Sequence, residues 1–180
     1  MSITSSRVLD TVGTLARLGL AAVWLVSGAI KISDSGQTFI AVKAYDVLPS
    51  ALIEPVATAL PLLELVLGVF LLFGLGTRIV AVVAGLLLLV LIAGIAQSWA
   101  RGLVIDCGCF GGGGQVDAGQ TQYPQEIARD TGFFALAVWL TVRPRTLFSV
   151  DGWLGWGRGN SSLRADDYSE EKSASLSERN

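Results

Sequence analysis

The chain contains no histidine. Histidine is the usual axial ligand of b-type haem, a frequent zinc ligand and the base of most nucleophile triads, so these three kinds of site are excluded. Cysteine is also scarce, because Cys107 and Cys109 are the only two in 180 residues, too few to hold an iron–sulfur cluster. If the protein moves electrons, its redox group is therefore this thiol pair or a diffusible molecule that the protein binds.

Charge is the second thing that the chain lacks. Charged residues make up 16% of the sequence, against about 25% in soluble domains. Hydrophobic residues make up 52%, and the mean hydropathy is +0.58. This composition predicts a membrane protein whose first partner is the lipid bilayer. The net charge is −2 and no basic block occurs, so nucleic acid is excluded as a partner.

Four segments predict membrane-spanning helices, each of which needs about 20 residues. Three of them are clearly apolar: 12–32, 56–75 and 79–100. The fourth, 124–142, is weaker because Glu126, Arg129 and Asp130 fall in its first turns. We accept it, since a polar first turn is tolerated where a helix meets a water-filled or protein-lined pocket. The predicted fold is an all-α, polytopic membrane four-helix bundle.

The segments around the spans predict a three-part chain. Residues 33–49 form a short interfacial helix, with Asp34 as its N-cap and Pro49 as its stop. A lid packed on the bundle without a chemical role is the alternative. The three parts are a cytoplasmic leader at 1–10, retained rather than cleaved as a signal peptide, a transmembrane domain at 11–143, and a cytoplasmic tail at 144–180. In that tail Phe148, Trp153 and Trp156 predict an interfacial belt, followed by a disordered, Ser-rich end.

Arg17 and Glu64 are ionisable residues inside predicted spans. A charge at this depth costs about 2.5 to 3.5 kcal/mol on insertion, so each of them needs a partner. At a rise of about 1.5 Å per residue, Glu64 lies about 13 Å and Arg129 about 7 Å below the same surface, and the long Arg129 side chain can close that gap. We therefore expect Glu64 to pair with Arg129, with Arg17 as the rival partner. A proton-carrying or quinone-binding role for Glu64 and a purely structural ion pair are both open.

The residues Cys107, Gly108 and Cys109 form the most distinctive motif. Gly108 lets the backbone fold back so that the two sulfur atoms can meet. So small a ring removes little chain entropy from the unfolded state, and strain makes its disulfide easy to reduce. The motif predicts a reversible dithiol/disulfide centre, in which Asp106 opposes and Arg101 and Arg129 favour a thiolate. A structural disulfide, a soft-metal site with Asp106 and inert thiols are the alternatives.

The distribution of cations predicts the orientation of the bundle. An even number of spans puts both termini on one side, and that side carries six cations near the span ends against four on the other. The six are Arg7, Arg17, Arg78, Arg143, Arg145 and Arg158; the four are Lys31, Lys43, Arg101 and Arg129. We therefore expect a multi-pass protein of the cell (inner) membrane with cytoplasmic termini. The Cys-Gly-Cys loop is then extracytoplasmic, where disulfides persist.

Several motifs together resemble the MauE/DoxX family of redox-associated membrane proteins. They are Arg17, the segment Ser27-Gly28-Ala29-Ile30-Lys31, Tyr45 with Leu48-Pro49, the segment Leu60-Pro61-Leu62-Leu63-Glu64-Leu65, and the run Asp106-Cys107-Gly108-Cys109-Phe110-Gly111. The resemblance covers residues 11–143 and is closest to MauE, because this cysteine pair is not expected in DoxX-type quinone oxidoreductase subunits.

This resemblance implies a thiol-redox component, in which Cys107 and Cys109 are catalytic and Glu64, Arg129, Arg17 and Asp106 support them. The implied partner is an extracytoplasmic thioredoxin-like protein or dehydrogenase, as in the biogenesis of methylamine dehydrogenase. A quinone is the cofactor to be considered, and none is expected to be covalently bound. The alternatives are a non-catalytic subunit that docks an oxidoreductase and a soft-metal transporter. A soft-metal transporter should also have cysteines within its membrane helices, and this sequence has none there. No resident metal is expected.

Overall fold

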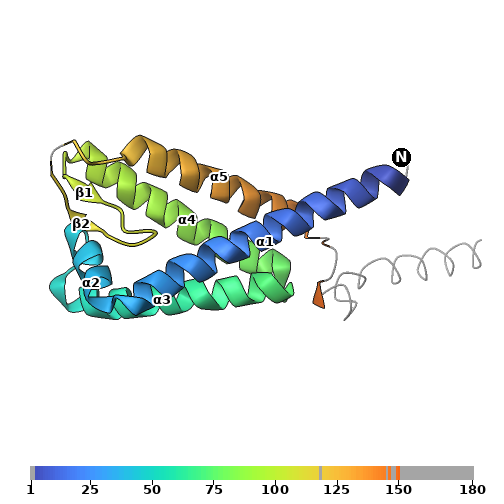
Figure 1. The fold of residues 1–180 in the computed structure, drawn as a ribbon, viewed down its shortest axis with the longest axis horizontal. Coiled ribbons are helices and arrows are strands. Elements are labelled where there is room, and N and C mark those ends of the chain that lie inside the picture. Colours follow the sequence, from blue (N-terminus) through green and yellow to red (C-terminus); the bar gives the residue numbers. More distant parts are fainter. Residues whose placement is uncertain (1–2, 118, 145, 147–148, 151–180) are drawn as a thin grey trace, which may run out of the picture.

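The computed structural model describes residues 3–117, 119–144, 146, 149 and 150. In chain order its elements are α1 (Ile3–Ser33), α2 (Ser35–Ala44), α3 (Ser50–Phe73), α4 (Thr77–Ala100), β1 (Ile105–Asp106), β2 (Gly114–Gln115) and α5 (Tyr123–Val142). The four long helices run along the long axis of the molecule, while α2 and the β1–β2 hairpin lie together at one end (Figure 1). The N-terminus lies at the opposite end (Figure 1).

Three helices of the described chain are long and apolar enough to cross a membrane, namely Arg7–Ser33, Ser50–Phe73 and Thr77–Ala100. These confirm the three clearly apolar segments of the sequence. Helix α5 forms where the fourth span is predicted, and its 20 residues are sufficient in length. It does not belong to the three apolar helices, because Glu126, Arg129 and Asp130 occupy its first two turns. Whether α5 crosses the bilayer stays a prediction.

Close packing of α1 on α3 depends on glycine. A Cβ atom added at Gly28 would lie 2.9 Å from Leu65 Cγ, and one added at Gly68 would lie 2.7 Å from Leu25 Cγ. Both distances are too short for carbon atoms, so the two glycines let the helices approach. Helices α4 and α5 form the second closely packed pair, and α1 also contacts α5. Residues from α1, α3, α4 and α5 share one core: Leu20, Ala21, Trp24, Leu71, Ala84, Leu88 and Leu140 are among its members.

The outer faces of the long helices are apolar. Ile79 and Val90 on α4, for example, are 69% and 67% exposed. Contiguous apolar surface of this kind is rare on soluble proteins, and on these helices it is the surface that lipid would cover. The structure thus supports a bilayer environment independently of the average composition.

Helix α2 begins as expected and ends early. Asp34 is its N-cap and accepts a hydrogen bond from the Gln37 N–H at 2.9 Å. The expectation that Pro49 stops this helix is wrong: α2 ends at Ala44, and Pro49 is instead the N-cap of α3. Asp46 explains the early end, because its φ of 51° is left-handed and cannot continue a right-handed helix.

The structure describes the two ends of the chain only in part. Helix α1 begins at Ile3, so most of the leader predicted at residues 1–10 belongs to the first helix. Of the tail predicted at 144–180, Phe148, Trp153 and Trp156 lie outside the described residues, as does the whole of 151–180.

Candidate functional site

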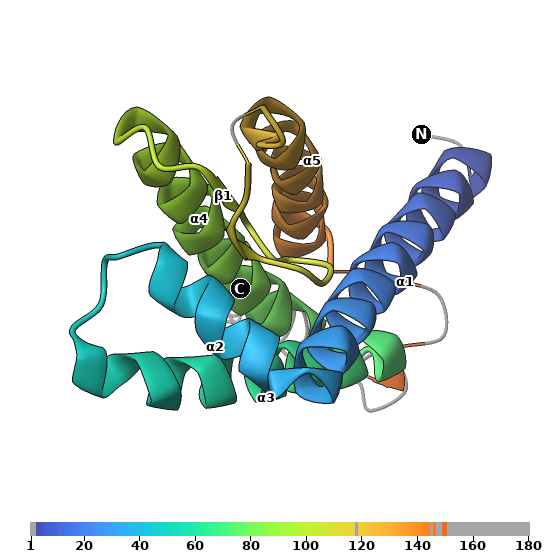
Figure 2. The same ribbon diagram turned by 60° about the vertical axis from the view of Figure 1, so that its left-hand side comes forward.

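The cysteines lie in the loop of the β1–β2 hairpin. The strands pair antiparallel, with Ile105 opposite Gln115 and Asp106 opposite Gly114. The loop between them lies beside α2 and directs its tip toward α1, with α5 behind it (Figure 2). Since α1 and α2 are far from this loop in sequence, only the folded bundle brings them to it.

Side chains from the helices hold the loop backbone at three carbonyl groups. The Ser27 hydroxyl of α1 lies 2.7 Å from the Cys109 carbonyl, and the Tyr45 hydroxyl at the end of α2 donates to the Cys107 carbonyl at 3.1 Å. The Gln37 amide of α2 donates to the Gly113 carbonyl. The loop is therefore fixed relative to the bundle, and α2 is part of the site rather than a detached lid.

Both cysteines are free thiols and are buried, with exposed fractions of 8% for Cys107 and 7% for Cys109. Their sulfur atoms lie 2.9 Å apart. Gly108 between them has a φ of 69°, and a Cβ atom there would lie 3.0 Å from the Cβ of Ala41 on α2. Glycine is thus required both by the left-handed backbone and by the contact with α2. The fold-back expected from the sequence is present.

The surroundings of the two sulfur atoms differ. Cys107 Sγ accepts the Cys109 N–H at 3.4 Å and lies 3.8 Å from Arg129 Nη2. Either thiol can donate across the pair, but these two further donors make Cys107 the better acceptor and Cys109 the donor. The hydrogen bond from the Cys109 thiol, with the Cys109 N–H and Arg129, lowers the pKa of Cys107 against the opposing effects of burial and Glu126. The same hydrogen bond, followed by burial, raises the pKa of Cys109.

Arg129 belongs to this site. Its Nε donates to Asp130 Oδ1 at 2.9 Å, and its guanidinium carbon lies 4.8 Å from the centre of the Phe110 ring. These contacts hold the guanidinium beside Cys107. Arg101, the other cation expected to favour a thiolate, is engaged elsewhere, because it pairs with Asp46 at 2.8 Å.

The predicted pairing of Glu64 with Arg129 is wrong. Glu64 is fully buried and pairs with Lys31 of α1, with Nζ and Oε1 2.5 Å apart. The reason is the close α1–α3 packing, which places the last turns of α1 against the middle of α3. The depth of Glu64 along its helix axis is compatible with Arg129, but its side chain faces a different helix.

Arg17, the rival partner, is also not paired with Glu64. Its Nη1 donates to the carbonyls of Leu71 and Leu72 at 2.9 and 3.0 Å, at the C-terminal end of α3. A cation is stabilised there by the negative end of the helix dipole. Arg17 therefore caps carbonyl groups at the C-terminal end of α3 and is not part of the cysteine site.

Ser27 connects the buried ion pair to the cysteine loop. Its Oγ accepts from Lys31 Nζ at 3.1 Å and lies 2.9 Å from Glu64 Oε2 and 2.7 Å from the Cys109 carbonyl. A hydroxyl carries one proton, so it can donate to only one of these two acceptors at a time. Glu64 thus reaches the site through Ser27, which sequence reasoning did not single out as a site residue.

An open cavity of about 560 Å³ gives access to the pair. Both cysteines line it, together with Asp106, Phe110, Gly111, Val116, Gln120, Gln122, Gln125, Glu126 and Arg129. The cavity lies between the hairpin and the start of α5. The polar first turn of α5 therefore faces a cavity, as predicted from the sequence of this segment.

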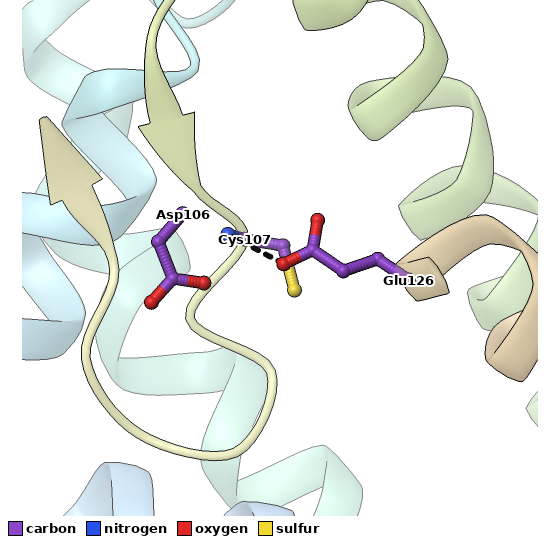
Figure 3. A group of neighbouring side chains, drawn as sticks. All are labelled: Asp106, Cys107 and Glu126. Atoms are coloured by element: carbon purple, nitrogen blue, oxygen red, sulfur yellow. Dashed lines mark hydrogen bonds between the residues drawn. The ribbon is translucent and has the colours of Figure 1, made fainter. Parts of the chain in front are cut away.

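Glu126 is a second site residue that sequence reasoning missed. It reaches from α5 toward Cys107 (Figure 3), and its Oε1 accepts the Cys107 N–H at 3.4 Å. A signal was present, because Glu126, Arg129 and Asp130 stand at i, i+3 and i+4 and so share one face of α5.

One oxygen or sulfur atom from each of Asp106, Cys107 and Glu126 lies within 4.8 Å of the others, a spacing that a metal ion could bridge. The Asp106 oxygens already accept the N–H groups of Gly108 and Gly113, at 3.4 and 3.2 Å. Asp106 therefore holds the loop turn together. The Arg129 cation beside Cys107 further disfavours a second cation here.

The family model described as methylamine utilisation protein MauE matches residues 9–143, which is 135 of the 180 residues. Neither the curated proteins nor the solved structures give a match. The matched range includes the cysteine pair, the Lys31–Glu64 ion pair and the charged turn of α5. The chain belongs to the MauE family.

Proposed function

We propose that this protein is an integral membrane thiol-redox component. Cys107 and Cys109 cycle between dithiol and disulfide and exchange electrons with an extracytoplasmic partner protein. The observation that carries the proposal is the pair of sulfur atoms 2.9 Å apart at the wall of an open cavity. A purely structural disulfide would need no such access, and it would close a ring too small to stabilise the fold.

The asymmetry of the pair assigns the roles. Cys107, with the lowered pKa, is the attacking thiolate, and its sulfur attacks one sulfur of the partner's disulfide to form a mixed disulfide. Cys109 then loses its proton and attacks Cys107, which releases the partner as a dithiol. Two electrons and two protons have moved to the partner, and the Cys107–Cys109 disulfide has formed. With a reduced partner the same steps run in reverse.

The family description, methylamine utilisation protein MauE, supports a client protein that takes part in methylamine utilisation. On this proposal the partner is a thioredoxin-like protein or a dehydrogenase subunit rich in disulfides, whose maturation needs disulfide exchange outside the cytoplasm. When a reduced partner is oxidised, the pair receives its two electrons and becomes the dithiol. These electrons then pass to a second thiol protein or to a membrane quinone, which becomes a quinol. A soft-metal transporter is less well supported, because the sequence has no cysteine outside the hairpin loop to pass a metal on.

Single-cysteine variants of the purified protein test the proposal. Cys109→Ser leaves the attacking thiol without a resolving partner, so it should accumulate a mixed disulfide with a thioredoxin-like protein or with glutathione. Cys107→Ser is the matched control and should trap much less. Wild type, equilibrated in thiol–disulfide buffers, should lose and regain both free thiols at a reproducible potential.

Two results would contradict it. One is a pair of thiols that stays reduced in oxidising buffer. The other is full partner maturation in cells by the Cys107→Ser/Cys109→Ser double variant, which would leave a non-catalytic docking subunit as the function.

A further inference from the structure

Glu126 is a buried carboxyl group that the redox steps above do not use. Its exposed fraction is 8%, and Oε1 accepts the Cys107 N–H at 3.4 Å. The other oxygen, Oε2, is buried and has no hydrogen-bond partner among the described residues. An unsatisfied buried carboxyl oxygen costs free energy, so its presence at the wall of the cavity calls for an explanation.

Its neighbours come from three parts of the fold. The hairpin contributes Asp106, Cys107 and Cys109, α5 contributes Arg129 and Asp130, and the end of α2 contributes Tyr45. Asp130 Oδ1 accepts from Arg129 Nε, and Asp106 accepts two loop N–H groups. Glu126 Oε2 and Asp130 Oδ2 both lack a hydrogen-bond partner among the described residues, and of these two acids Glu126 is the one that lines the open cavity.

We propose that Glu126 carries a proton to and from the cysteine pair during disulfide exchange. Two facts of geometry support this role: a carboxylate oxygen of Glu126 lies within 4.8 Å of Cys107 Sγ, and both groups line the same cavity (Figure 3). This role of Glu126 rests on the proposed redox function, in which Glu126 is the residue that transfers a proton. General acid–base catalysis by a positioned carboxyl contributes about 10²-fold to 10⁴-fold in rate.

The proton balance defines the step. Oxidation of the two thiols to the disulfide releases two protons and two electrons, and the partner's disulfide takes up both to become a dithiol. Glu126 accepts the proton of the Cys107 thiol as the pair is oxidised and passes it to the partner thiolate that leaves through the cavity. In the reverse direction, protonated Glu126 returns it to Cys107 as the disulfide opens.

The test compares Glu126→Gln with wild type in the full-length protein. Glutamine keeps an oxygen that can accept the Cys107 N–H but cannot exchange a proton. The measurements are the rate of oxidation by glutathione disulfide and the rate of reduction by dithiothreitol, across the pH range in which carboxyls and thiols titrate. We expect both rates to fall by about 100-fold. In wild type, oxidation should slow at low pH as Glu126 becomes protonated, and reduction should slow at higher pH as Glu126 loses its proton. Both dependences should disappear in Glu126→Gln, and Glu126→Asp should restore them in part.

A reaction that needs no proton transfer distinguishes a purely structural role of Glu126 from proton transfer. Alkylation of the Cys107 thiolate by iodoacetamide should not be slowed in Glu126→Gln, whereas displacement of the loop would slow it along with disulfide exchange. Glu54→Gln makes the same chemical change at an exposed position of α3 and is the matched control. It should alter neither the rate of oxidation nor the rate of reduction.

Unchanged pH profiles in Glu126→Gln, with wild type exchanging normally, would overturn the role of Glu126 alone. If wild type itself fails to exchange with either reagent, the proposed redox function fails instead. The two failures are therefore distinguishable in one set of measurements.

Discussion

At the scale of single residues, the ion pair between Lys31 and Glu64 joins two buried charges of α1 and α3. Glu64 is fully buried and Lys31 is 8% exposed. Neither the lipid nor the solvent can replace a lost partner at this depth, because an unpaired charge in an apolar interior keeps its full desolvation cost. Ser27 lies between this pair and the Cys109 carbonyl, within hydrogen-bond distance of both Glu64 and that carbonyl.

Removal of one member of the pair should therefore be costly. We expect Glu64→Ala to lower the free energy of unfolding by about 3 to 5 kcal/mol, because it leaves the Lys31 ammonium buried without its carboxylate. The double variant Lys31→Met/Glu64→Leu should recover most of this loss, since it removes both charges at similar volume. Denaturant unfolding of the protein in detergent measures both. Recovery by a Glu64→Arg/Arg129→Glu exchange would instead support the contact that the structure does not have.

At the scale of elements, the hairpin loop depends on its fit against α2. Gly108 and Gly113 both approach Ala41: added Cβ atoms would lie 3.0 and 2.5 Å from the Ala41 Cβ. The buried face of α2 consists of Thr38 and Ala41, whereas the larger Phe39 is 37% exposed. The sequence correctly predicts a helix in this segment but does not tell which of its faces is buried.

This fit predicts the effect of a methyl group at the loop. Gly108→Ala should shift the disulfide equilibrium toward the dithiol and slow its formation at least about tenfold. A left-handed backbone costs about 1 to 2 kcal/mol for a residue with a Cβ, and the contact with Ala41 adds to it. Gly102→Ala is a matched control, because Gly102 has nearly the same φ, 67° against 69°, but open space around its Cβ position.

Counting free thiols after equilibration in thiol–disulfide buffers measures this effect. Equal behaviour of Gly102→Ala and Gly108→Ala would show that backbone strain rather than contact with α2 limits the loop.

At the scale of the whole molecule, the end that carries the cysteine loop and the end that carries the α3–α4 connector lie opposite each other (Figure 1). The cation bias of six to four predicts that the connector end is cytoplasmic. On that prediction, the cavity between the hairpin and α5 opens toward the compartment in which thiol–disulfide exchange partners work.

Labelling of introduced cysteines tests this orientation. In a Cys107→Ser/Cys109→Ser background, Asp117→Cys in the exposed part of the hairpin segment should react with a membrane-impermeant maleimide in intact cells. Arg78→Cys in the connector region should react only after permeabilisation. The opposite pattern would place the cysteine pair in the reducing cytoplasm and remove the basis for an extracytoplasmic partner.

Sequence reasoning alone reached the membrane class, the positions of the long helices and the fold-back at Cys107 and Cys109. These features are local, because an apolar run, a cap such as Asp34 and a glycine between two cysteines act within a few residues of each other. Only the tertiary structure decided which charges meet. Rise per residue gives the depth of Glu64, but the close approach of α1 and α3 at Gly28 and Gly68 selects Lys31 as its partner.

The chemistry of the cysteine pair was likewise decided by packing. The sequence contains Glu126 and Arg129 but does not tell which faces of α5 meet the hairpin. Folding brings both beside Cys107 and so distinguishes one sulfur from the other, since hydrogen bonds and charges act on a thiol only within a few ångströms. The presence and spacing of the two cysteines are therefore properties of the sequence, and the difference between them is a property of the fold.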